Sequence, residues 1–158
     1  MTALPTDWLS LQAGYGLADA TFKEFIDVEQ GQLFGNPSAA GFRTPNAPKH
    51  TFNASATVRL PVTESIEAFW RTDVLYESTR YDQIHNLAET GDTTKVNMRL
   101  GIETGGLQVA LFAKNLLNDR TANSVTRFLE PDRLFARRAF GVALPRGRQI
   151  GVTATYDF

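Results

Sequence analysis

The carboxyl-terminal stretch, residues 148–158, alternates between two kinds of side chain along its whole length. Its apolar positions are Ile150, Val152, Ala154, Tyr156 and Phe158, and the residues between them are polar or small. Because successive side chains of a β-strand point to opposite faces, this pattern predicts a strand with one apolar and one polar face. Soluble domains seldom end in a strand whose last residue is a Phe that carries the terminal carboxylate. The apolar face therefore needs either lipid or a protein core.

The same alternation recurs along the chain and predicts an all-β, antiparallel fold of about six meandering strands. The expected strands cover residues 8–25, 50–60, 65–76, 94–104, 107–113 and 148–158. In the fourth of these, Lys95, Asn97, Arg99 and Glu103 share one face, opposite a face made of Val96, Met98, Leu100 and Ile102. Four charged or amide groups would each need a partner in a dry core, so they fit a wet lumen better.

The connections between the expected strands alternate between long and short. Long polar segments cover 26–49, 80–93 and 128–147, whereas short turns follow Leu60 and Thr104. Long loops at one end and short turns at the other are typical of a transmembrane β-barrel. A sheet of six strands leaves two open edges, which hydrocarbon does not tolerate. We therefore expect a segment of a larger barrel, or a chain that pairs with other strands.

Composition excludes several classes of protein. The net charge of -1 gives no argument for nucleic acid as a partner. The absence of cysteine excludes disulfides and thiolate metal sites. The first eight residues, MTALPTDW, lack the basic start and apolar middle of a signal peptide. Since an exported protein needs such a signal, we expect that the chain is either not exported or a piece of an exported protein.

Three segments together resemble the carboxyl-terminal end of the barrel of TonB-dependent outer-membrane receptors. They are GFRTPNAPKHTFNASATVRL at 41–60, LFAKNLLNDR at 111–120 and LPRGRQIGVTATYDF at 144–158. In that family an Asn-Leu pair and an acidic residue follow an apolar strand, and a Pro-Arg entry leads into a strand closing on Phe. Here the acidic residue, Asp119, comes later than in the commonest form, and Thr121 stands where an aromatic residue is frequent.

The resemblance implies a barrel of about 22 strands, of which residues 1–158 would supply the last six. The signal peptide, the TonB-contacting segment and the plug domain would lie outside this chain. The implied function is active uptake of a scarce nutrient, foremost an iron–siderophore complex, across the outer membrane of a Gram-negative bacterium. The implied partners are outer-membrane lipid, the rest of the barrel, the plug, the TonB complex acting through the plug, and the barrel-assembly machinery.

The resemblance also assigns roles to individual residues. The membrane-assembly signal would consist of Val152, Ala154, Tyr156 and Phe158. In the last long loop, Arg133, Arg137 and Arg138 concentrate positive charge that would attract an anionic ligand, but we favour a solvated loop that touches anionic surface lipid. His85 has no metal-site spacing around it, so we expect it in a solvated loop.

No pattern of a catalytic site or cofactor site is present, so we expect no enzyme and no cofactor. One group of charged residues could suggest acid–base chemistry, but its opposite charges are intermixed on one expected wall, which favours an ion-pair network in the lumen. It consists of Glu67, Arg71, Asp73, Lys95, Arg99, Glu103 and Lys114. Two further hypotheses remain at this point: a soluble all-β ligand-binding barrel, and a subunit of a passive outer-membrane porin.

Overall fold

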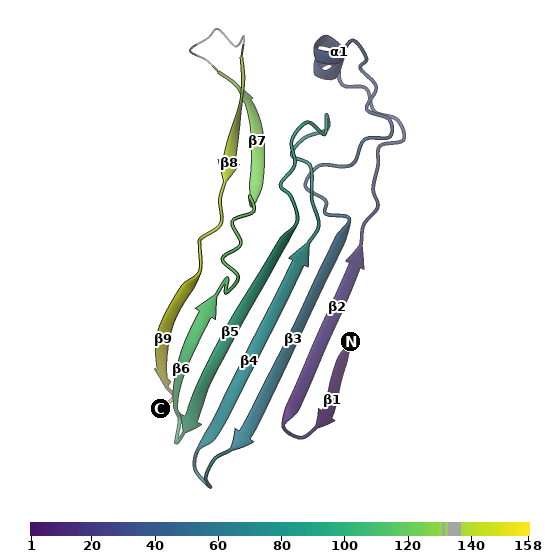
Figure 1. The fold of residues 1–158 in the computed structure, drawn as a ribbon. Coiled ribbons are helices and arrows are strands. Elements are labelled where there is room, and N and C mark those ends of the chain that lie inside the picture. Colours follow the sequence, from purple (N-terminus) through teal and green to yellow (C-terminus); the bar gives the residue numbers. More distant parts are fainter. Residues whose placement is uncertain (131, 133–136) are drawn as a thin grey trace.

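A computed structural model describes residues 1–130, 132 and 137–158, and its main element is a single-layer antiparallel sheet. Seven strands lie in the order β1-β2-β3-β4-β5-β6-β9 (Figure 1). They are β1 (Thr2–Thr6), β2 (Leu9–Leu17), β3 (His50–Pro61), β4 (Glu67–Glu77), β5 (Thr93–Thr104), β6 (Leu107–Lys114) and β9 (Gln149–Tyr156). A separate hairpin pairs β7 (Ser124–Leu129) with β8 (Arg138–Ala143), and one short helix, α1, covers Val28–Phe34.

The strands predicted from alternation all form, with two differences at the amino-terminal edge. The first predicted strand ends at Leu17 rather than near residue 25, and β1 is an additional strand that precedes it. Pro5, a residue type more usual in turns, lies within β1 where the pairing register shifts between Ala3 and Thr6. An edge strand tolerates proline because its outer N–H groups have no partner strand in the sheet.

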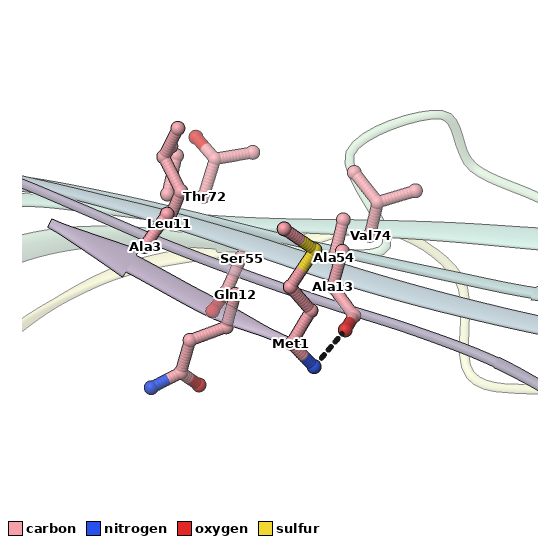
Figure 2. A pocket seen from close by; sticks show the side chains of 10 residues that line it. Met1, Ala3, Leu11, Gln12, Ala13, Ala54, Ser55, Thr72 and Val74 are labelled. Atoms are coloured by element: carbon pink, nitrogen blue, oxygen red, sulfur yellow. Dashed lines mark hydrogen bonds between the residues drawn. The ribbon is translucent and has the colours of Figure 1, made fainter. Parts of the chain in front are cut away.

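The register of the sheet places most apolar side chains on one face and the charged side chains on the other. One row of facing apolar residues crosses five strands: Val58, Trp70, Leu100, Leu111 and Val152. Near the β1 edge, Figure 2 shows Gln12 and Ser55 on one side of the sheet and Leu11, Thr72 and Val74 on the other. Since a slip of one residue would exchange the two faces, this agreement across neighbours specifies the register.

The apolar face of the sheet is uncovered. Among the described residues, the only buried hydrophobic side chains are Ala39, Phe69 and Ala110. On the apolar face, Leu100 is 57% exposed and Val152 is 67% exposed. A continuous apolar surface of this width is unusual on a soluble monomer, so it needs an apolar environment that the described residues do not supply.

The connections at the two ends of the sheet differ in length, as the sequence predicted: short turns lie at one end and long loops at the other. The turns β1–β2, β3–β4 and β5–β6 lie at one end, which we call the short-turn end; the loops, α1 and the β7–β8 hairpin gather at the opposite, long-loop end (Figure 1). The β5–β6 turn is tight because Gly105 and Gly106 both take positive φ values, 51° and 81°. No helix in the described part of the chain is long and apolar enough to cross a membrane.

Two of the long loops contain regular structure that alternation did not reveal. In the first loop, the Asp27 side chain caps α1 by accepting a hydrogen bond from the Glu29 backbone N–H, and Gly35 ends the helix in a left-handed conformation. The third loop, between the end of β6 at Lys114 and the start of β9 at Gln149, is longer than predicted and contains the β7–β8 hairpin, with Arg127 directly opposite Phe140. The long-loop end is therefore an ordered structure in its own right.

Candidate functional site

The polar face of the sheet, which we call the polar wall, carries all the charged residues that the sequence assigned to a lumen. The register places Glu67 opposite Glu103, Arg71 opposite Arg99, Lys95 opposite Leu75, and Lys114 opposite Gln149. Asp73 lies in the same row as Asn97. The seven residues therefore share one surface, although they do not all form one connected cluster.

At the short-turn end of the polar wall, one cation lies between two carboxylates. Glu67 and Glu103 face each other across β4 and β5, which by itself is unfavourable for like charges. The Arg59 guanidinium on β3 forms an ion pair with Glu67, and its Nη1 lies 3.6 Å from Glu103 Oε2. Gln108 Nε2 also donates to Glu103 at 3.3 Å. Arg59 thus balances two carboxylates that would otherwise repel each other.

Halfway along the wall, the pair of facing arginines is only partly balanced. Arg71 turns to Asp73, with Nη2 2.7 Å and Nε 3.1 Å from the carboxylate. Arg99 instead makes two long hydrogen bonds, from Nη2 to Gln108 Oε1 at 3.4 Å and to Thr153 Oγ1 at 3.5 Å. These contacts are those of an ion-pair network with one unbalanced member, and they bring together no pair of groups arranged for proton transfer.

The Asn-Leu motif at the end of β6 ties several strands together. Asn115 is buried and takes a left-handed conformation, with φ of 50°, which Asn tolerates better than most residues. Its Nδ2 donates to the backbone carbonyls of Asp119 and Arg146 at 2.9 and 3.1 Å, and its backbone N–H donates to Asn97 Oδ1 at 3.0 Å. The motif therefore joins β5, β6 and the segment that leads into β9.

Asp119, the acidic residue of the same motif, accepts several hydrogen bonds. Its Oδ2 accepts from the Thr94 backbone N–H at 2.7 Å and from Thr93 Oγ1 at 2.8 Å, and its Oδ1 accepts from the Thr121 backbone N–H at 2.7 Å. Burial by itself would raise the pKa of Asp119, but the hydrogen bonds from Thr121, Thr94 and Thr93 outweigh it and hold this pKa well below its usual range.

We expect Asp119→Asn to lower the free energy of unfolding at pH 7 by about 1 kcal/mol, because the hydrogen bonds to an ionised acceptor are lost. A folded-state pKa below the unfolded value of about 3.9 stabilises the fold above that pH. The advantage of the parent chain over the variant should therefore shrink as the pH falls below about 4. Urea unfolding in detergent micelles at pH 7 and pH 3 measures both quantities.

Asp7→Asn is the matched control, because Asp7 lies exposed in the β1–β2 turn. It should change stability little at either pH. If Asp119→Asn behaved like this control at pH 7, the motif would not stabilise the ionised carboxylate.

At the long-loop end, Arg127 on β7 joins the three loops. Its side chain is 4% exposed, and Nη2 lies 2.6 Å from Glu29 Oε1 in the first loop. Its Nε donates to Gln83 Oε1 in the second loop at 2.8 Å. The second and first loops are further linked by Asn86, whose side chain accepts from the Arg43 backbone N–H and donates to its carbonyl, at 2.8 and 3.0 Å. We call this assembly of the loops the loop cap.

The prediction that His85 lies in a solvated loop is wrong. Its side chain is buried in the loop cap, with Nε2 3.1 Å from Asp27 Oδ2. The other oxygen of Asp27 accepts the N-cap hydrogen bond of α1 at 3.0 Å. His85 and Arg127 therefore both hold the amino-terminal turn of α1 against the other loops.

Of the arginines proposed to contact a ligand, Arg133 lies outside the described residues. Arg137 and Arg138 are exposed at the start of β8. Sequence reasoning missed Arg127, the most deeply buried arginine among those described in this loop. Its only signal was a basic residue within the short apolar run SVTRFL at 124–129, and nothing in that run shows which side chain faces inward.

We expect Arg127→Gln to loosen α1 without unfolding the sheet. Glu29 is about half exposed, so the ion pair contributes modestly, on the order of 1 kcal/mol. Amide hydrogen exchange of α1 should accelerate about fivefold, while exchange of β3, β4 and β5 stays unchanged. Arg138→Gln, which removes the same charge from an exposed position of the hairpin, is the control. Unchanged exchange of α1 in Arg127→Gln would show that the loop cap does not depend on this contact.

Three of the four proposed assembly residues lie on the apolar face of β9. Val152 and Ala154 face Leu111 and Val109 of β6, and Tyr156 faces Leu107. Phe158 follows the strand, with its ring centroid 5.1 Å from that of Tyr156 in an edge-on arrangement. Val152, Ala154 and Tyr156 therefore share one face of the strand, and the role of the four residues as an assembly signal stays a prediction.

Comparison with known proteins yields no match to a family model or to a curated protein. Solved structures do match. The ferric yersiniabactin uptake receptor FyuA from Yersinia pestis is 15% identical and superposes with a TM-score of 0.77, covering 99% of this chain and 22% of the receptor. This chain has the fold of a receptor β-barrel segment.

BauA, the ferric preacinetobactin receptor from Acinetobacter baumannii, is 17% identical, with a TM-score of 0.67 and coverage of 99% of this chain and 21% of that one. The sequence resemblance to TonB-dependent receptors is thus confirmed at the level of the fold. The chain spans about a fifth of the length of each receptor.

Proposed function

We propose that this chain forms part of the wall of an outer-membrane receptor that takes up a scarce nutrient by a TonB-dependent mechanism. The observation that carries the proposal is the pair of continuous faces, one apolar and uncovered, the other polar and charged, in a sheet that matches ferric-chelate receptors in fold. Lipid of a Gram-negative outer membrane would cover the first face, and a plug domain would pack against the second.

The remaining partners follow from the same proposal. The rest of the barrel would continue the sheet at its β1 and β9 edges, since an open edge is not tolerated in hydrocarbon. The TonB complex would act through the plug, and the barrel-assembly machinery would recognise the end of β9. The cargo would be an iron–siderophore complex, which the names of both structural neighbours support.

The proposal is tested by partition of the expressed 158-residue chain and by circular dichroism with and without detergent. We expect an insoluble chain that gains β structure only in micelles. A soluble, cooperatively folding monomer would contradict the proposal and favour the soluble ligand-binding barrel. That alternative would bury the apolar residues of β5, whereas Leu100 and Ile102 are 57% and 45% exposed. A stable oligomer with a water-filled lumen would favour the porin.

The cargo has a separate test. If it contains iron, the transcript that encodes this chain should rise several-fold when the bacterium carrying it is starved of iron. An unchanged transcript would contradict an iron cargo and leave the barrel proposal intact.

A further inference from the structure

A cationic hollow lies on the polar wall, between its middle and the long-loop end. It has a volume of about 470 Å³ and is lined by Asp73, Asn97, Arg99, Phe112, Lys114 and Thr153, among others. The hollow extends across β4, β5, β6 and β9, so its shape depends on the sheet rather than on a loop. It belongs to the surface that would face the lumen.

Two positive charges in this hollow are not balanced. Asp73 is already bound by Arg71, with an Nη2–Oδ1 distance of 2.7 Å. Within the described part of the chain, neither Arg99 nor Lys114 forms an ion pair with a carboxylate. Lys114 Nζ lies 5.7 Å from the centroid of the Phe112 ring, and Arg99 makes only the two long hydrogen bonds described above.

Among the described arginines of the wall, Arg99 is an exception. Arg59 is shared by two carboxylates, and Arg71 holds one. Arg99 also faces Arg71 directly in the register, an arrangement that like charges disfavour. The Asp73 carboxylate relieves this repulsion by pairing with Arg71, but it leaves Arg99 without an ionic partner among the described residues. A second carboxylate placed in the hollow would accept charge-assisted hydrogen bonds from Arg99 and Lys114.

The apolar groups beside the hollow indicate that its occupant is a polypeptide rather than a small anion. Leu75 projects from the polar wall with 40% of its surface exposed, and it lines an adjoining hollow with Asn53, Arg71 and Asp73. Exposure of this apolar side chain to water is unfavourable, whereas a packed protein segment would bury it and so stabilise the contact. A segment that carries an acidic residue beside an apolar one would satisfy both hollows together.

We propose that Arg99 and Lys114 form the docking point for an acidic side chain of the polypeptide that fills the lumen; this inference rests on the proposed function. The positions of these side chains on the wall also define which residues the lumen-filling segment must carry. Its acidic residue lies level with the middle of β5, and next to it an apolar residue packs on Leu75.

The test uses the 158-residue chain folded in zwitterionic micelles and two synthetic peptides. The probe is acetyl-Gly-Glu-Leu-Glu-Gly-amide, and its neutral twin carries Gln in place of both Glu residues. Binding is followed by NMR of the Arg99 Nε–H group. We expect a saturable shift with the acidic peptide only. Arg99→Gln and Lys114→Gln, followed through the backbone amides of β5 and β6, should each weaken binding at least fivefold. Lys49→Gln, which removes a charge paired with Asp19 in the first loop, should not.

Four results would overturn the inference. They are absence of binding by the folded chain, equal binding of the neutral twin, binding unaffected by Arg99→Gln, and sulfate binding as tight as the peptide, which would mark a site for small anions. Each leaves the proposed function standing. Conversely, a chain that folds in water without detergent contradicts the proposed function itself, which separates the two failures.

Discussion

Ala54→Arg is expected to lower the free energy of unfolding in micelles by about 2–4 kcal/mol, the cost of an arginine on the lipid face near the middle of a membrane strand. Ala54 lies on the apolar face, between Ala13 of β2 and Val74 of β4 in the register. A shallow hollow of about 410 Å³ lies at this point, lined by these small side chains (Figure 2). The hollow can therefore hold the new arginine side chain without a steric clash. The fall in the free energy of unfolding would then measure the cost of moving its charge out of water.

Ser55→Arg is the matched control for this substitution. Ser55 is the next residue of the same strand and similarly half-buried, but it points to the polar wall, where it faces Asp73. We expect a change within about 0.5 kcal/mol, as for an ordinary surface position. Urea unfolding followed by tryptophan fluorescence gives both values. Equal losses for the two variants would show that lipid does not distinguish the faces.

The strands and their faces could be predicted because alternation is a local property that the register preserves. The run from Lys95 to Glu103 shows this well: its polar members all lie on the polar wall and its apolar members on the opposite face. β1 could not be predicted in the same way. Pro5 normally marks a turn, and only the position of β1 at the sheet edge makes it acceptable in a strand.

The loop cap could not be predicted because its contacts join residues that are far apart in the chain. Arg127 and Glu29 are 98 residues apart, and Arg127 and Gln83 are 44 apart. Sequence shows that the last loop is basic, but not which arginine faces inward. His85 was misjudged for the same reason, since its partner Asp27 lies in another loop. The seven residues of α1 are too few for a helical period to stand out.

Gly101 has a role on the polar wall that the sequence pattern did not indicate. The Phe69 ring of β4 lies over this glycine, and a Cβ added there would be 2.8 Å from Phe69 Cζ. The same Cβ would be 2.9 Å from Ala110 Cα and would overlap the Val109 carbonyl oxygen, both in the backbone of β6. Gly151 differs, because the three atoms nearest to an added Cβ all belong to the ring of Phe112, with Cζ at 2.7 Å.

We therefore expect Gly101→Ala to cost about 2–3 kcal/mol, because the β5 and β6 backbones must separate, and Gly151→Ala only about 1 kcal/mol. A second substitution distinguishes the two causes. Phe112→Leu should restore most of the loss in Gly151→Ala, since the obstructing atoms belong to a side chain. Phe69→Leu should not rescue Gly101→Ala, since the backbone of β6 still obstructs the new methyl group. Rescue of Gly101→Ala by Phe69→Leu in urea unfolding would place the obstruction in the ring, and would mean that the β5–β6 pairing is looser than the structure indicates.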